Sequence, residues 1–171
     1  MIIEERVERS QYVKLITWIV SFIILMAGIV FPVLILWVNQ DMMSKVIGAS
    51  VLCLIFFTLI FTVAYQPRKL ILSETHIIME RILGQVYISY SDITDISLYH
   101  RENVAEIRIF GIGGLGGYIG KFYNSKIGFY TAYVGDYSQA FLIKINNREK
   151  YVMSCRHAEK IVEEVKSRVK Q

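Results

Sequence analysis

The sequence has few cysteines and prolines, the residues typical of disulfide-bonded, metal-binding or disordered chains. Among 171 residues there are two cysteines and two prolines. Two cysteines, one of them inside an apolar run, supply neither a disulfide framework nor the ligand spacing of a zinc site. Few prolines, and no Ser/Pro or Gln/Asn tract, exclude a disordered or mucin-like stalk. We therefore expect no metal and no other cofactor.

Charged residues are scarce as well. They make up 20% of the chain against 54% hydrophobic residues, whereas an average soluble domain has about 25% charged residues. The apolar excess lies mostly between residues 15 and 65, in two uncharged runs, Leu15 to Val38 and Val46 to Tyr65. This uneven distribution excludes a purely soluble protein.

Each uncharged run is long enough to cross a lipid bilayer. Twenty-four residues at 1.5 Å rise give about 36 Å of helix, against a hydrocarbon core of roughly 30 Å. Trp18, Trp37 and Tyr65 stand near the ends of the runs, where amphipathic rings prefer the membrane interface. The first run is too long for the core of a cleaved signal peptide. The sequence predicts a transmembrane hairpin over residues 15–65.

The flanking charges predict how this hairpin is oriented. Residues 39–45 between the runs contain one basic residue, Lys45, whereas five lie on the outer flanks. Because basic flanks stay in the cytoplasm, both termini are expected there. Neither run contains an ionisable Asp, Glu, Lys, Arg or His, so a transporter has no proton or ion relay to use. The five flanking residues are Arg6, Arg9, Lys14, Arg68 and Lys69.

Residues 66–171 carry the whole net charge of +4, as fifteen Lys and Arg against eleven Asp and Glu. This surplus suits an anionic leaflet but falls short of a nucleic-acid footprint, so no nucleic acid is expected as a partner. Short runs rich in Ile, Val, Tyr and Phe alternate with period two and predict strands. The predicted strands are 69–72, 77–81, 86–90, 93–99, 105–110, 128–134, 140–145 and 150–153.

The last stretch changes to helical spacing. Ala158, Ile161, Val162 and Val165 repeat on one face, which predicts an amphipathic helix. Ser154 is the expected N-cap. Seven or eight antiparallel strands followed by one helix form the plan of a pleckstrin-homology-like sandwich or barrel closed by a C-terminal α-helix.

Three segments resemble bacterial pleckstrin-homology (PH) domains: 70–77 (LILSETHI), 88–93 (ISYSDI) and the glycine-rich 108–122 (RIFGIGGLGGYIGKF). The last resembles the signature of a subgroup with two N-terminal spans and a cytoplasmic PH-like domain. Cys155 and Arg156 stand where relatives often have Pro and Asp. The resemblance implies a PH-like fold, a bacterial inner membrane location and a tendency to assemble, but no established activity.

The pattern Gly111-x-Gly113-x-x-Gly116 matches the dinucleotide fingerprint as a string of letters. That fingerprint needs a helix directly after the turn to receive the pyrophosphate. The residues that follow, 118–124, are rich in glycine and aromatics and lack helical period. We expect no nucleotide.

Residues 111–128 instead suggest a long connection between strands, and long connections are usually functional or mobile. Aromatic rings with polar tips are favoured at interfaces and at headgroup depth. One hypothesis is that this loop meets the membrane or a second copy, and the other is that its aromatics fill the core. The candidate binding residues are Leu115, Tyr118, Lys121, Phe122, Tyr123 and Lys126.

No set of residues indicates an enzyme. His76, His100 and His157 are scattered, and Cys155 beside His157 fits a buried thiol better than an activated one. The carboxylates, Glu106 among them, form no evident acid/base pair. The loop 73–76 is acidic and short, which argues against inositide recognition.

The expected organisation is a cytoplasmic N-terminal segment (1–14), a transmembrane hairpin (15–65) and a cytoplasmic PH-like domain (66–171). The favoured function is a non-catalytic interaction or scaffold module on the membrane, with a homo-oligomer or another protein as partner. The alternatives are recognition of anionic lipid headgroups through the 111–130 loop and an unrecognised membrane-associated enzyme.

Overall fold

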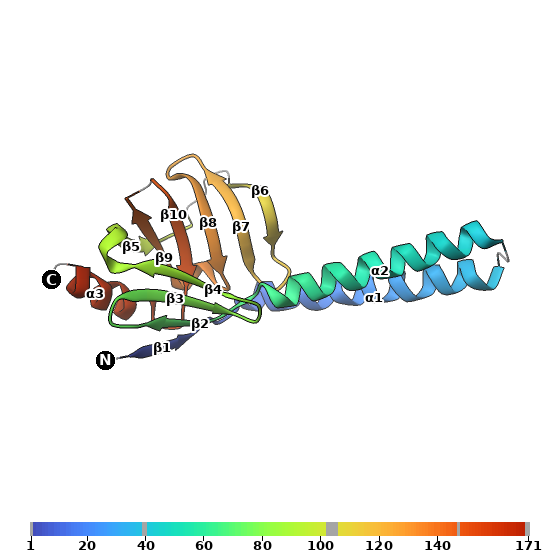
Figure 1. The fold of residues 1–171 in the computed structure, drawn as a ribbon, viewed down its shortest axis with the longest axis horizontal. Helices are drawn as coiled ribbons and strands as arrows, with labels where there is room; N and C mark the ends of the chain where they lie inside the picture. Colours follow the sequence, from blue (N-terminus) through green and yellow to red (C-terminus); the bar gives the residue numbers. More distant parts are fainter. Residues whose placement is uncertain (1, 39–40, 102–105, 147, 170–171) are drawn as a thin grey trace.

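The computed structural model describes the chain except residues 1, 39–40, 102–105, 147 and 170–171. Two long helices, α1 (Gln11–Val38) and α2 (Met42–Ala64), run side by side out of a β domain (Figure 1). In α2, Asp41 caps the N-terminus by accepting a hydrogen bond from the Ser44 N–H at 3.1 Å. The molecule therefore has an elongated helical part and a compact β part.

The two helices keep most of their apolar side chains exposed. Within the described residues, both are long and apolar enough to cross a membrane, and only 12% and 11% of their most apolar windows are buried. They approach closely at Gly28, where an added Cβ would lie 3.0 Å from Ile55 Cδ1.

The β domain contains two open sheets. The first has four strands in the order β1-β2-β3-β4, and the second has six in the order β5-β9-β10-β8-β7-β6. Their bounds are β1 Ile3–Arg6, β2 Pro67–Leu72, β3 His76–Arg81, β4 Gln85–Ser89, β5 Ile93–Tyr99, β6 Glu106–Gly113, β7 Tyr118–Asn124, β8 Gly128–Val134, β9 Ala140–Ile145 and β10 Lys150–Ser154.

This arrangement corrects the expected strand plan. The described residues form ten strands rather than seven or eight, and β10 runs parallel to β8 rather than antiparallel. Neither sheet closes into a barrel. Strands β5, β8 and β9 have the predicted bounds, because each is a short run rich in apolar and aromatic residues next to turn residues. Strands β1 and β7 were not predicted.

The glycine-rich stretch is a β-hairpin and not a long loop. Strands β6 and β7 pair along their length, with Gly111 opposite Gly120. A Cβ on Gly111 would lie 2.1 Å from the Ile119 carbonyl oxygen, and both glycines have φ near +120° (121° and 123°). Only glycine permits this close crossing of the two backbones. Because these positions have no side chains, the alternation of apolar and polar residues that marks a strand is not visible in the sequence.

The core lies between the sheets and under the C-terminal helix, α3 (Ala158–Val169). The predicted stripe is confirmed: Ala158, Ile161, Val162 and Val165 are all buried. They pack with residues of both sheets, among them Leu70, Met79 and Phe141. A second cluster occupies the other face of the six-stranded sheet and includes Tyr99, Phe122, Tyr130 and Leu142.

Ser154 does not cap α3, contrary to expectation. It is the last residue of β10, is buried, and its Oγ accepts a hydrogen bond from the Gly135 N–H at 2.9 Å. The helix begins later, at Ala158. The serine therefore joins β10 to the residue after β8 instead of starting the helix.

The two helices leave the domain between neighbouring strands. Strand β1 precedes α1, β2 follows α2, and the two strands pair antiparallel from Ile3 opposite Leu72 to Arg6 opposite Lys69. The N-terminal stretch, expected as a separate segment, thus contributes the edge strand of the first sheet.

Candidate functional site

Two hairpin turns of the β domain are hydrogen-bonded to the two helices. At the β6–β7 turn, the Gly116 N–H donates to Thr17 Oγ1 of α1 at 2.8 Å. At the β3–β4 turn, the Leu83 N–H donates to the Ala64 carbonyl at the end of α2 at 2.8 Å. Figure 1 shows both turns at the end of the domain from which the helices project. The domain is therefore fixed to the helices at several points rather than by a free linker.

Gln66, buried directly after α2, is central to this junction. Its Oε1 accepts a hydrogen bond from the Arg9 guanidinium. A Cβ on Gly116 would lie 1.9 Å from Gln66 Nε2, and Gly116 has a φ of +74°. Glycine at this position lets the turn contact both the Gln66 amide and Thr17.

Large apolar side chains are exposed at the same end of the domain. Ile82 and Leu83 are exposed in the β3–β4 turn, and β6 exposes Ile109 (55%) and Phe110 (73%). Strand β6 is the outermost strand of its sheet, and its outer edge has no partner strand among the described residues. Because exposed apolar surface marks interaction sites, these four residues, here named the apolar end, are candidate binding residues.

The structure separates the six predicted binding residues. Leu115 and Tyr118 are half-buried at the helix end of the β6–β7 hairpin. Lys126 is exposed beyond the other end of β7. The six residue steps from Tyr118 to Asn124 span about 20 Å. These residues therefore do not converge on one ligand.

The remaining predicted residues belong partly to the core. Phe122 is buried against Tyr130, with ring centroids 5.8 Å apart. Tyr123 is half-buried against Phe129 at 5.0 Å, and Lys121 is exposed. The core-filling interpretation is thus confirmed for Phe122.

A polar cluster joins the start of β6 to β8. The side chain of Glu106 is 3% exposed, and its Oε1 accepts hydrogen bonds from the hydroxyls of Tyr130 (2.6 Å) and Tyr137 (2.9 Å). Its Oε2 lies 2.9 Å from Arg101 Nε. Burial raises the pKa of both tyrosines above its ordinary value, so they remain protonated donors. The cluster therefore links the start of β6 to β8 and to Tyr137 beyond it. The sequence alone had indicated no partner for Glu106.

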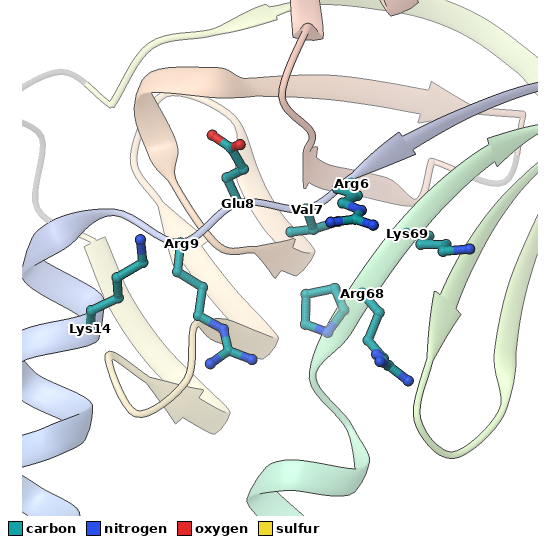
Figure 2. Close-up of a pocket in the computed structure, with 8 residues that line it drawn as sticks. Arg6, Val7, Glu8, Arg9, Lys14, Arg68 and Lys69 are labelled. Atoms are coloured by element: carbon teal, nitrogen blue, oxygen red, sulfur yellow. The ribbon is translucent and has the colours of Figure 1, made fainter.

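A basic groove of about 600 Å³ opens where the helices join the domain (Figure 2). This volume is within the range of roughly 300–1,000 Å³ common for ligand pockets. Five of its lining side chains are cationic and one is anionic. They come from β1 and the linker after it, the first turn of α1, and β2. The lining residues are Arg6, Val7, Glu8, Arg9, Lys14, Pro67, Arg68 and Lys69.

Acidic neighbours neutralise little of this charge. Lys69 pairs with Glu4 at 3.3 Å, and Glu8 pairs with Arg156 at 3.4 Å, both at the surface. Exposed pairs of this kind contribute about 0–1 kcal/mol. Within the described part of the chain, three of the cations have no ion-pair partner, namely Arg6, Lys14 and Arg68. The groove thus carries excess positive charge.

The cysteine and histidine side chains that might have suggested catalysis form no reactive pair. Burial raises the pKa of the Cys155 thiol to about 12, so it is not a reactive thiolate at neutral pH. The partner of His157 is Glu5, with His157 Nδ1 3.1 Å from Glu5 Oε1. Among the residues that the structure describes, no group of three or more His, Cys, Asp or Glu side chains could hold a metal ion.

These features define a small two-sheet β domain with a C-terminal helix, joined to two apolar helices. The model of the bacterial PH domain family matches residues 68–169, and the chain belongs to this family. Neither the comparison with curated proteins nor that with solved structures gave a match. Strand β1, both helices and the groove residues before Arg68 lie outside the matched region.

Proposed function

We propose that this chain is a membrane-anchored PH domain that presents a binding surface at the cytoplasmic face of a bacterial inner membrane. The observation that carries the proposal is that β1, which precedes the two apolar helices in the sequence, pairs with β2, which follows them. Strand β1 leads into α1, and β2 follows α2. Because these two strands pair, both ends of the helical hairpin lie on the same side. The domain is thereby held beside the lipid with one fixed end toward it.

The exposed apolar surface of α1 and α2 supports membrane insertion. Such a surface would be poorly soluble in water, whereas in a bilayer it faces hydrocarbon. The five basic residues on the outer flanks, against Lys45 alone in the connection, support cytoplasmic termini.

The apolar end supports a role in binding rather than in catalysis. Ile109 and Phe110 lie on an edge strand, and such strands accept a further strand or a partner surface. A protein partner or a second copy of this chain would bury them. PH domains are typically non-catalytic modules, which agrees with this role.

The full chain, purified in mild detergent from membranes washed with alkaline carbonate, tests this function. We expect the wild type in the washed membrane and expect it to retain a protein partner or a second copy. Ile109→Asp with Phe110→Asp is expected to stay in the membrane and lose that partner. Tyr87→Asp, at an exposed aromatic on β4, is the matched control. Removal of the wild type by the wash would refute the anchor. Equal retention by both variants would refute the surface.

The second candidate function is recognition of anionic headgroups through the 111–130 hairpin. The contact of Gly116 with Thr17 favours it, because it brings Leu115 to the start of the apolar run. Replacing Leu115 and Tyr118 by Asp tests it. A clear loss of salt-sensitive binding to vesicles containing phosphatidylglycerol would support this function, and unchanged binding would refute it.

A further inference from the structure

We propose that the basic groove binds the phosphate group of an anionic membrane lipid. The inference rests on the proposed insertion of α1 and α2 in the bilayer, and it names a ligand that the fold family and the hairpin hypothesis do not assign to these residues. The groove differs from the hairpin site in position, residues and partners.

The first argument is charge. Arg6 lies directly opposite Lys69 in the antiparallel β1–β2 pair, and like charges opposite one another destabilise a sheet. Arg6 has no acidic partner within the described chain. A bound anion would offset this repulsion. Glu8 is the one acidic residue that lines the groove, and Glu4 pairs with Lys69 at the surface.

The second argument is that the groove is held in shape by the backbone. The Val7 N–H donates to the Arg68 carbonyl at 2.9 Å, and the Ser10 N–H donates to the Gly135 carbonyl at 3.2 Å. Figure 2 shows Arg9 and Arg68 extending to the same side of the linker, away from Glu8. Arg9 is held in addition by its hydrogen bond to Gln66. Pre-ordered cations lose less entropy when they bind an anion.

Guanidinium groups also suit the ligand. Arginine presents planar, paired N–H donors that match phosphate oxygens, and lysine adds a point charge. Three arginines and two lysines line this groove. A phosphodiester, with its two free oxygens, is therefore the ligand chemistry that the groove fits.

The position of the groove favours a lipid phosphate over a free one. Lys14 directly precedes the first uncharged run, and Arg68 follows the second after Gln66 and Pro67. In the proposed orientation these side chains lie at the depth of the headgroups in the anionic cytoplasmic leaflet, which attracts basic residues next to a membrane span. A lipid is already concentrated at that depth, whereas inorganic phosphate is not.

The test uses the full purified chain in detergent micelles. Dioleoyl phosphatidylglycerol, dioleoyl phosphatidylcholine and inorganic phosphate are added in separate titrations, and native mass spectrometry counts the lipid bound. We expect phosphatidylglycerol to bind at least tenfold more tightly than phosphatidylcholine. Millimolar inorganic phosphate is expected not to displace it.

The variant Lys14→Gln with Arg68→Gln is expected to weaken phosphatidylglycerol binding about tenfold or more. The matched control is Lys160→Gln with Lys166→Gln, which removes two exposed cations from α3 and is expected to leave binding unchanged. Lys14→Arg with Arg68→Lys keeps both charges and is expected to retain binding. Near-native thermal unfolding of each variant excludes misfolding as the cause.

Equal weakening by the α3 control, or no weakening by the groove variant, would overturn the proposal. Displacement of the lipid by inorganic phosphate would overturn the lipid as the ligand. If the wild type is integral to the membrane and shows no preference for phosphatidylglycerol, this inference fails while the proposed function stands. A wild type that is soluble without detergent would instead refute the proposed function.

Discussion

The helical hairpin and the β domain are both rich in apolar residues, but they place them in opposite ways. In α1 and α2 most of them are exposed, whereas in the domain residues such as Leu70, Phe141 and Met153 are fully buried. The domain builds its own interior from two sheets and α3. The helices bury little against each other, so most of their apolar surface is left uncovered by the described residues. Exposure, not composition alone, distinguishes the two regions.

The largest expected effect is in the interior of the domain. Phe141→Ala removes a fully buried ring between the sheets and α3 and is expected to lower the free energy of unfolding by about 3–5 kcal/mol. Phe129→Ala, at a ring that is 68% exposed, is the control and is expected to change it by less than about 0.5 kcal/mol. Chemical unfolding followed by tyrosine fluorescence measures both. Equal losses would contradict the division into buried and exposed apolar residues.

The next effect tests the environment of the helices. Leu54, near the middle of α2, is 64% exposed. If lipid surrounds it, Leu54→Arg costs about 2.5–3.5 kcal/mol and less protein should integrate into membranes. Leu54→Met is the apolar control and should integrate normally. Integration of the arginine variant at the wild-type level, or improved solubility, would indicate that water surrounds this helix surface.

A smaller effect is expected where the two regions meet. Thr17→Val keeps the shape of the side chain but removes the acceptor of the buried Gly116 N–H, at a cost of about 1–3 kcal/mol. Hydrogen exchange at the Gly116 amide should speed up markedly. Thr58→Val is the matched control, because its hydroxyl bonds only within α2, to the Ile55 carbonyl. Unchanged exchange at Gly116 would show that this contact does not hold the hairpin turn to α1.

The last effect is absent at neutral pH, appears only in alkaline solution, and is expected in the domain alone. The pKa of Cys155 is raised from 9.0 to about 12, and burial also raises the pKa of Tyr130. The unfolded state therefore releases these protons before the folded state does. Stability should be constant below about pH 9 and fall above it by up to about 1.4 kcal/mol per pH unit for each group.

Unfolding measured between pH 7 and 11 checks this slope. Cys155→Ala is expected to make the free energy of unfolding fall less steeply above about pH 9. Any loss of packing in this variant would lower that energy equally at every pH. Glu106→Gln is expected to leave the contribution of the thiol unchanged. An alkaline slope identical in wild type and Cys155→Ala would mean that the thiol is not buried as described.

The sequence was sufficient where neighbouring residues carry the signal. The short apolar and aromatic runs next to turn residues predicted the bounds of β5, β8 and β9, and the helical stripe from Ala158 to Val165 predicted the buried face of α3. The two long uncharged runs became α1 and α2. Each of these patterns is local and rests on side chains that alternate or repeat.

The sequence was insufficient where the fold depends on distant partners. Strand β1 reads Ile-Glu-Glu-Arg and pairs with β2 only because the chain returns after both helices. Without that pairing, Arg6 and Arg68 are merely flanking charges, so the groove could not be foreseen. In β7, Gly120 has no side chain to mark a strand, and the preceding turn is rich in glycine. Phe122 was assigned to binding although it is buried.

The position of β1 sets the order in which the molecule can be completed. On the ribosome this strand is made before both helices, whereas β2, its hydrogen-bonding neighbour, is made only after them. The four-stranded sheet therefore cannot reach its final width until the helical hairpin has formed and returned the chain to its starting side. An error in either helix would leave the edge of β2 open to aggregation, so completion of the sheet reports on correct formation of the helical hairpin.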